Sequence, residues 1–167
     1  LSDNDFPCLA ESHVSGKEFS VEAFIHNGKI LFMNINEYIH LGYSQVLPPC
    51  PELEKKRPII RKAIEKLVKA FGLKNGVIHP EYFIDKDDEL NFGEVAYRVP
   101  GGHIFELIER AYGFNAYEGM ILVWDPDIDE EELMKFFPDE VTGKKGHAGN
   151  LLVYPRKKHV TKLEVPE

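Results

Sequence analysis

The 167-residue chain carries 28 acidic and 20 basic side chains, a formal net charge of −8. Proteins that hold nucleic acid need a basic face for the phosphates, so this balance argues against a nucleic-acid partner. No segment is apolar for long enough to span a bilayer, and the start does not read as a signal peptide. The two cysteines, Cys8 and Cys50, lack a CxxC spacing and predict neither a disulfide framework nor a zinc site. We therefore expect a cytoplasmic protein with no membrane partner.

The first predicted elements are two strands joined by a tight turn. Alternating apolar and polar residues predict a strand from Lys17 to His26 and a return strand from Lys29 to Asn36. Asn27-Gly28 between them is the strongest short signal for a hairpin, because both central residues of a type I′ turn need positive φ. Residues 37–51 contain Gly, Ser and Pro and are predicted to form a long loop.

An amphipathic helix is predicted next. Its apolar residues recur at helical spacing and form one stripe: Ile60, Ala63, Ile64, Leu67, Val68 and Phe71. Pro58 near its start implies a late N-terminus or a kink. Gly72 or Gly76 is predicted to end the helix.

The second half of the chain predicts a further hairpin followed by short helices. Strands are expected at residues 76–84 and 90–98, with an acidic turn between them, and Pro80 places the first strand at a sheet edge or marks a bulge. Helices are expected from about His103 to Tyr112 and near residues 116–123 and 129–137, with short strands at 151–154 and 160–163. This order predicts an α+β fold in which an antiparallel sheet is covered by helices on one side.

Glu81 and Glu94 are the candidates for a metal site. They lie on two predicted strands joined by a tight turn, so both carboxylates can face the same way. Two carboxylates at close range repel each other unless a cation lies between them, and Mg²⁺ often binds through one or two carboxylates plus phosphate oxygens. The alternative, which the spacing alone favours, is two solvated glutamates on an exposed face.

Arg98, Gly101 and Gly102 are the candidates for an anion site. A Gly-Gly turn lets the backbone approach a ligand closely, and the helix N-terminus after it offers free N–H groups and a partial positive charge. Arg98 adds a planar donor suited to phosphate or carboxylate. An equally good alternative is a glycine-rich strand-to-helix turn with an arginine in a surface ion pair.

The remaining polar residues carry less information. Glu11 and Glu18 flank a turn before the first strand, which by itself indicates no site. Among the 7 histidines, His79 is the one next to the carboxylate pair, and no HExxH or paired-His spacing predicts zinc. No GxSxG, Walker-type or GxGxxG motif is present, and no serine or cysteine nucleophile stands out.

Three stretches, taken in order, resemble motifs of the ATP-grasp superfamily, and the resemblance covers nearly the whole chain. Residues 10–22 (AESHVSGKEFSVE) resemble the family's hinge and the strand after it. Residues 72–81 (GLKNGVIHPE) and 92–98 (FGEVAYR) resemble two stretches that carry metal ligands. The tail at 149–155 is similar to the closing segment of the carboxylate–amine ligase branch. Residues 1–167 would then be the C-terminal portion of an ATP-grasp domain.

The resemblance implies a role for individual residues. The cofactors are ATP and Mg²⁺, and the residues implied around the nucleoside are Glu11, His13 and Val14 at adenine, Glu18 at the ribose hydroxyls and Phe83 packed on adenine. Glu81 and Glu94 would bind the metal, and Arg98 would contact phosphate or substrate. Gly101 and Gly102 would steady the developing anion, and His79 would contact substrate or phosphate.

The sequence departs from the family pattern in two places. Ala96 stands where many relatives have asparagine as a further metal ligand, which puts the second Mg²⁺ in doubt. The family's lysine-bearing strand and Gly-rich loop lie N-terminal to the hinge, and the chain begins at Leu1, so we expect a missing N-terminal portion and a fragment that is inactive alone. Apolar surface left exposed by that truncation could favour a homodimer.

The function implied by the resemblance is an ATP-dependent ligase. It would activate a small-molecule carboxylate as an acyl phosphate, and an amine, or less often a thiol, would then displace phosphate. The alternative is a non-catalytic or regulatory nucleotide-binding module with a degenerate metal site, which Ala96 favours. A third possibility, an interaction domain that has lost nucleotide binding, would leave the five charged candidates at positions 11, 18, 81, 94 and 98 without a purpose.

Overall fold

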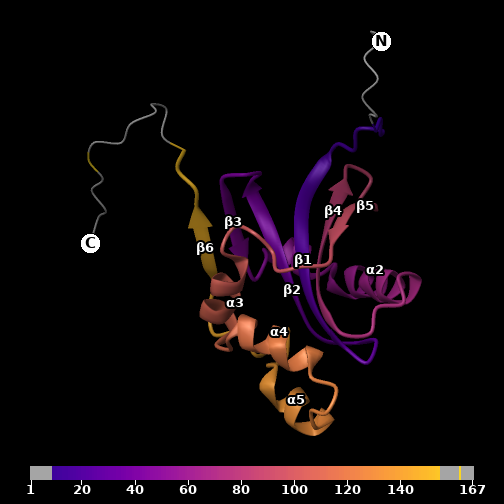
Figure 1. Cartoon of the computed structure of the whole chain (residues 1–167). Coiled ribbons are helices and arrows are strands. Elements are labelled where there is room, and N and C mark those ends of the chain that lie inside the picture. The colour runs from indigo at the N-terminus through magenta and orange to yellow at the C-terminus, as the bar shows by residue number, and fades with distance from the viewer. Residues whose placement is uncertain (1–8, 155–161, 163–167) are drawn as a thin grey trace.

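One six-stranded antiparallel sheet forms the centre of the protein in a computed structural model that describes residues 9–154 and residue 162 (Figure 1). The strands are β1 (Gly16–His26), β2 (Lys29–His40), β3 (Ser44–Leu47), β4 (Gly76–Asp85), β5 (Leu90–Ala96) and β6 (Ala148–Leu151), in the order β5-β4-β1-β2-β3-β6. The helices are α1 (Pro51–Glu54), α2 (Arg57–Ala70), α3 (Ile104–Tyr112), α4 (Ala116–Trp124) and α5 (Glu130–Phe136). The α+β fold is confirmed.

The first hairpin is confirmed, and it is longer than predicted. Asn27 and Gly28 both have positive φ, 50° and 75°, as the tight turn between β1 and β2 requires. β2 continues to His40, and β3 returns beside it within the segment that was predicted to be a loop. The prediction was wrong there because this part of the hairpin carries polar and aromatic residues on the face that lines a cavity, so the apolar alternation that indicates a strand is missing.

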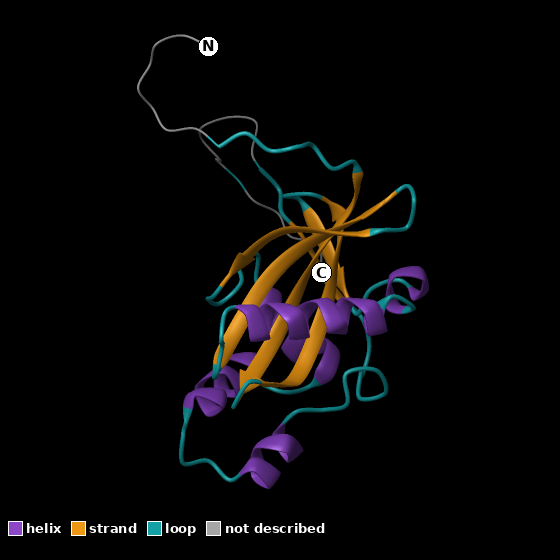
Figure 2. Cartoon of the chain, turned by 90° about the vertical axis from the view of Figure 1, so that its right-hand side faces the viewer, coloured by secondary structure: helices purple, strands orange, loops and turns teal. Residues whose placement is uncertain are grey.

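Helix α2 covers one face of the sheet (Figure 2). It begins at Arg57, so Pro58 lies in its first turn, where a missing N–H leaves no hydrogen bond unmade. Its buried stripe packs on apolar residues of β1, β2 and β4, and the shared core contains Phe19, Val21, Ala23, Ile25, Met33, Ile35, Ile60, Ile64, Val68 and Ile78. The predicted amphipathic helix is confirmed, and it begins a turn earlier than its apolar stripe.

Helices α3, α4 and α5 pack on the opposite face, so the prediction that helices cover one side was wrong. The reason lies in β1 and β2, which also carry Phe24 and Phe32 on this second face. Both rings are fully buried against α3 and the residues that follow α3 and α5, including Phe105, Phe114 and Phe137. Exposing either ring to water would cost the burial of a large aromatic side chain, so this face needs its own helices.

The second hairpin places β4 inside the sheet, between β5 and β1. Pro80 therefore does not mark an edge strand. Instead, the pairing with β5 shifts between Glu81 and Tyr82, where Gly93 is the extra residue of β5. A Cβ on Gly93 would lie 3.0 Å from the carbonyl oxygen of Glu81, so a side chain at this bulge would crowd the backbone of β4. Pro80 was expected to mark either a sheet edge or a bulge, and the structure contains the bulge.

The closing strand β6 pairs with β3 at residues 148–151, three residues earlier than predicted. The strand expected at 160–163 lies outside the described residues, apart from Lys162. No helix among the described residues is both long enough and apolar enough to cross a membrane.

Candidate functional site

The sheet face that packs against α3–α5 has a polar region next to its aromatic core. Four side chains of β1 and β2 on this face are fully buried: Ser20, Glu22, Asn34 and Asn36. Ser20 pairs in register with Asn36 and Glu22 with Asn34, so the four point the same way. Buried polar groups are costly unless they have hydrogen-bond partners, which makes their contacts informative.

The carboxylate of Glu22 is held from three directions. Ser20 Oγ donates to Glu22 Oε1 at 2.9 Å, and Asn34 Nδ2 donates to Oε2 at 2.8 Å. From β4, Nδ1 of His79 lies 2.9 Å from Glu22 Oε1. A charged group with no access to water is thus compensated by donors from three different strands.

His79 bridges Glu22 to Glu81. Its Nε2 lies 3.5 Å from Glu81 Oε1, so both ring nitrogens face carboxylates. Burial by itself would lower the pKa of His79, but the hydrogen bonds and negative charges of the two glutamates outweigh it and raise the pKa to about 9 from an ordinary value of 6.5. The ring therefore carries a positive charge at neutral pH.

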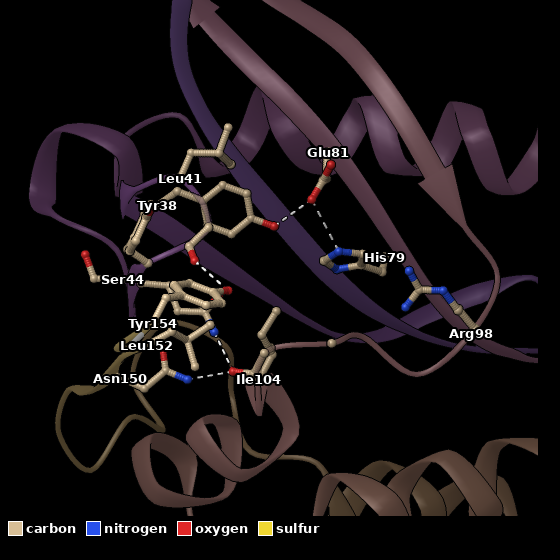
Figure 3. A pocket seen from close by; sticks show the side chains of 15 residues that line it. Tyr38, Leu41, Ser44, His79, Glu81, Arg98, Ile104, Asn150, Leu152 and Tyr154 are labelled. Atoms are coloured by element: carbon tan, nitrogen blue, oxygen red, sulfur yellow. Dashed lines mark hydrogen bonds and ion pairs between the residues drawn. The ribbon is translucent and has the colours of Figure 1, made fainter. Parts of the chain in front are cut away.

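Glu81 receives a second donor from β2. The hydroxyl of Tyr38 donates to Glu81 Oε1 at 2.7 Å, as drawn in Figure 3. The hydrogen bond from His79 lowers the pKa of Glu81 the most, and Tyr38 and the charge of Arg98 lower it further. Glu81 is thus ionised and oriented.

Glu81 and Glu94 lie directly opposite each other on β4 and β5, as their predicted hairpin implied. Residues opposite each other in an antiparallel pair share a face, with Cβ atoms roughly 5 Å apart. Among the described residues, none forms a hydrogen bond or ion pair with the Glu94 carboxylate. Glu18, on β1, is close enough for both charges to affect it. Burial is the main cause that raises the pKa of Glu18, and the negative charges of Glu81 and Glu94 raise it further. Three carboxylates therefore gather at this end of the sheet.

Phe83 lies beside Glu18. The two are paired in register between β4 and β1, and Phe83 is half-buried on the same face as Glu81. The predicted ribose and adenine residues Glu18 and Phe83 are thus next to the predicted metal ligands. Within the described part of the chain no group of three or more His, Cys, Asp or Glu side chains is arranged to hold a metal ion, so the protein offers two opposed carboxylates and not a closed cage.

A cavity of about 310 Å³ opens beside Glu81 (Figure 3). Its walls come from the tip of the β2–β3 hairpin, the turn before α3, and β6 with the residues after it, and its lining includes His79, Arg98, Gly101, Gly102, Tyr43 and Tyr154. Gln45 Nε2 and Asn150 Nδ2 both donate to the carbonyl of Gly102, each at 2.6 Å, which ties β3 and β6 to this turn. The predicted metal ligand Glu81 and the predicted anion site therefore open into one space.

Arg98 is exposed at this cavity, and its guanidinium donates to the carbonyl of Val99 at 2.8 Å. The turn is open at Gly101, where a Cβ would meet nothing within 4 Å, but not at Gly102, where φ is 61° and a Cβ would lie 2.8 Å from Nε2 of Gln45. α3 begins after His103, which caps it in the left-handed region at φ 58°. Space for a ligand is available next to the helix N-terminus.

Glu11, His13 and Val14 lie apart from this cluster. They belong to the coil that leads into β1, where Glu11 and His13 are exposed and Val14 is half-buried. Their roles at adenine stay predictions, as do those of the other site residues.

A family model described as an ATP-grasp domain matches residues 4–105, more than half of the chain. The chain belongs to the ATP-grasp family. The match contains the hinge-like segment and both strands that carry the carboxylates, and it ends at the start of α3.

Relatives of this ATP-grasp chain include amino acid ligases. It is 26% identical over 127 residues to the L-arginine-specific L-amino acid ligase of Bacillus subtilis, a match that covers 72% of this chain and 30% of that protein. In fold it is similar to an L-amino acid ligase from Bacillus licheniformis, with a TM-score of 0.69 at 22% identity over 86% of this chain and 35% of the other. It is also similar in fold to N5-carboxyaminoimidazole synthetase from Staphylococcus aureus complexed with ADP, with a TM-score of 0.57 at 17% identity over 85% and 48% of the two chains. The chain spans about a third of the length of the two amino acid ligases.

Several residues of the candidate site were not predicted from the sequence, chiefly Glu22, Tyr38, Gln45 and Asn150. A signal existed for Glu22, because a serine and a glutamate interrupt the apolar stretch at residues 19–25 on alternate positions, and two asparagines do the same in β2. Gln45 and Asn150 carried no such signal, since both reach Gly102 only through the pairing of β3 with β6, which joins residues 45 and 150.

Proposed function

We propose that this chain is the ATP- and Mg²⁺-binding part of a ligase that joins a carboxylate to an amine, or less often to a thiol, through an acyl phosphate. In this proposal residues 1–167 are the C-terminal portion of the ATP-grasp domain. The observation that carries it is the direct register pairing of Glu81 with Glu94 beside the cavity that Arg98 lines. In a member of the ATP-grasp family, this arrangement suits the terminal phosphates of a nucleotide.

Glu81 and Glu94 fit Mg²⁺ by their chemistry. Two carboxylates face each other at short range, and the described residues supply no cation to Glu94, which favours a bound positive ion between the strands. Mg²⁺ takes one or two carboxylates and completes its octahedron with phosphate oxygens and water, so two ligands are sufficient. When bound, Mg²⁺ would neutralise negative charge on the phosphates of ATP.

The other residues would position nucleotide and substrate. Glu18 would accept hydrogen bonds from the ribose hydroxyls, and Phe83 would pack on adenine together with the coil at residues 11–14. Arg98 would hold an anionic oxygen of phosphate or substrate, because its guanidinium is planar and always charged. Gly101 and Gly102 would let backbone N–H groups approach the same anion.

The proposed reaction has two steps. An oxygen of the substrate carboxylate attacks the γ-phosphorus of ATP, the bond to the β-γ bridging oxygen breaks, and ADP leaves with an acyl phosphate formed. The amine nitrogen then attacks the acyl carbon, the bond to the phosphate oxygen breaks, and the nitrogen loses a proton as phosphate departs. Both L-amino acid ligases among the relatives support an amino acid as a substrate.

A non-catalytic nucleotide-binding module is the second candidate, and Ala96 favours it. Ala96 pairs in register with His79 and contributes no ligand where many ATP-grasp relatives have asparagine. This alternative predicts that the protein binds nucleotide but does not form ADP and phosphate when a carboxylate and an amine are added.

Calorimetric titration of Mg·ADP into the chain tests the proposal. The Glu81→Ala/Glu94→Ala variant should bind more weakly than wild type, and removing Mg²⁺ should abolish the difference. The control Glu109→Ala/Glu118→Ala removes the same charge from exposed positions on α3 and α4 and should bind as wild type does. Equal Mg²⁺-dependent affinity in wild type and the Glu81→Ala/Glu94→Ala variant would show that the metal assignment is wrong.

A further inference from the structure

A fully buried glutamate in the middle of a sheet needs an explanation beyond the fold. Glu22 has no exposed surface, and its neighbour on the same face of β1 is Phe24, in the aromatic core. Replacing a buried ion pair by well-packed apolar residues is often neutral or stabilising, so the fold alone does not call for a charge at this position. The contacts of Glu22 point instead toward the carboxylate cluster.

Hydrogen bonds and one ion pair form a chain that ends at Glu81. Ser20 and Asn34 fix both oxygens of Glu22, and Glu22 in turn contacts Nδ1 of His79 at 2.9 Å. The other ring nitrogen of His79 faces Glu81 at 3.5 Å. The histidine is itself buried, so its ring is held by packing as well as by Glu22.

The contacts to Glu81 involve one of its two oxygens. His79 Nε2 forms an ion pair with Oε1, and the hydroxyl of Tyr38 donates a hydrogen bond to the same oxygen. Oε2 accepts no hydrogen bond among the described residues, and the strand opposite brings Glu94 to the same face. Holding one carboxylate oxygen by donors while the other stays available is how residues behind a metal site orient a ligand.

We propose that Glu22 and His79 are positioning residues that orient the Glu81 carboxylate for a divalent cation shared with Glu94. This inference rests on the function proposed above, because it needs a cation at Glu81. The inference explains why β1 carries Glu22 at a fully buried position.

The test uses the 167-residue chain with Mn²⁺ and ADP, following free Mn²⁺ by electron paramagnetic resonance. Glu22→Gln removes the charge behind the histidine, and His79→Asn removes the donor that faces Glu81. Each should raise the Kd for Mn²⁺ about tenfold or more, the usual effect of losing a group that orients a metal ligand. Glu37→Gln is the matched control: its side chain is also buried on the sheet but binds Lys17 and the Cys50 N–H, so its Kd should stay within about twofold of wild type.

The outcomes separate this inference from the function on which it rests. If Glu81→Gln weakens Mn²⁺ binding while folded Glu22→Gln and His79→Asn bind like wild type, the positioning role is wrong and the metal site stands. If Glu81→Gln also binds like wild type, or wild type binds no Mn²⁺, the proposed metal site fails and the positioning role fails with it. Thermal unfolding of each variant establishes that it is folded, and if Glu22→Gln does not fold, His79→Asn decides the question.

Discussion

Replacing Glu94 with Gln should change the stability of this protein in opposite directions with and without a cation. Glu94 lies opposite Glu81, and like charges directly opposite on paired strands destabilise the pair by about 0.2–1 kcal/mol. Glu94→Gln removes that repulsion and keeps the size of the side chain. In a chelated sample the free energy of unfolding of the variant should therefore exceed that of wild type by up to about 1 kcal/mol, which for a chain of this size raises Tm by at most roughly 2–4 °C.

With Mg²⁺ and ADP present, the order should reverse. A ligand at about 100 times its Kd stabilises the folded state by roughly 2.7 kcal/mol, which corresponds to a rise in Tm of roughly 5–11 °C. Wild type should gain this rise, whereas Glu94→Gln should gain little of it because one metal ligand is lost.

The assay is thermal unfolding followed by circular dichroism, with EDTA or with Mg²⁺ and ADP. A Glu94→Gln protein that is less stable than wild type under EDTA would refute the repulsion between the two carboxylates. Equal gains on adding Mg²⁺ and ADP would refute the metal role of Glu94.

Two further predictions concern stability away from the site. Phe32→Ala should lower the free energy of unfolding by about 3–5 kcal/mol, because the ring is fully buried against Phe24, Tyr112, Phe114 and Phe137. Urea unfolding measures this, and a loss below 1 kcal/mol would contradict the described packing. For Glu37, burial alone would raise the pKa, but hydrogen bonds from the Cys50 N–H and the Lys17 ammonium outweigh it and lower the pKa below its ordinary value of 4.5. A lowered folded-state pKa stabilises the protein above pH 4.5 and loses that contribution as pH falls through the folded value, so the stability advantage of wild type over Glu37→Gln should shrink from pH 7 to pH 3. An advantage that does not change with pH would refute the ionised, hydrogen-bonded state of Glu37.

Local patterns in the sequence predicted the elements that depend on near neighbours. Asn27-Gly28 predicted the first hairpin, and the apolar stripe from Ile60 to Phe71 predicted α2, since both signals arise within one turn or one helix face. The pairing of Glu81 with Glu94 was predictable for the same reason: a tight turn joins their strands. The family resemblance, carried by short motifs in order, was confirmed by the match over residues 4–105.

The register of the first hairpin shows where local information ends. A plain two-residue turn would place Glu22 opposite Met33, but the pairing shifts between Phe24 and Ile25, and Glu22 faces Asn34 instead. One extra residue in a strand moves every later side chain to the other face, so this bulge decides whether Glu22 has a polar or an apolar partner. The hydrogen bond from Asn34 and the one between Ser20 and Asn36 follow from it.

The sequence by itself therefore determined the α+β class, the hairpins, the main helix and the two facing carboxylates. Only the tertiary structure decided that helices cover both faces of the sheet, that β4 pairs with β1, and that hydrogen bonds and one ion pair connect Glu22, His79, Glu81 and Tyr38. The physical reason is that the contacts between strands are distant in sequence: the Tyr38–Glu81 and Glu22–His79 hydrogen bonds join residues 43 and 57 positions apart. Their formation depends on how the whole core packs and on the need of buried charges for partners, and no local pattern carries that information.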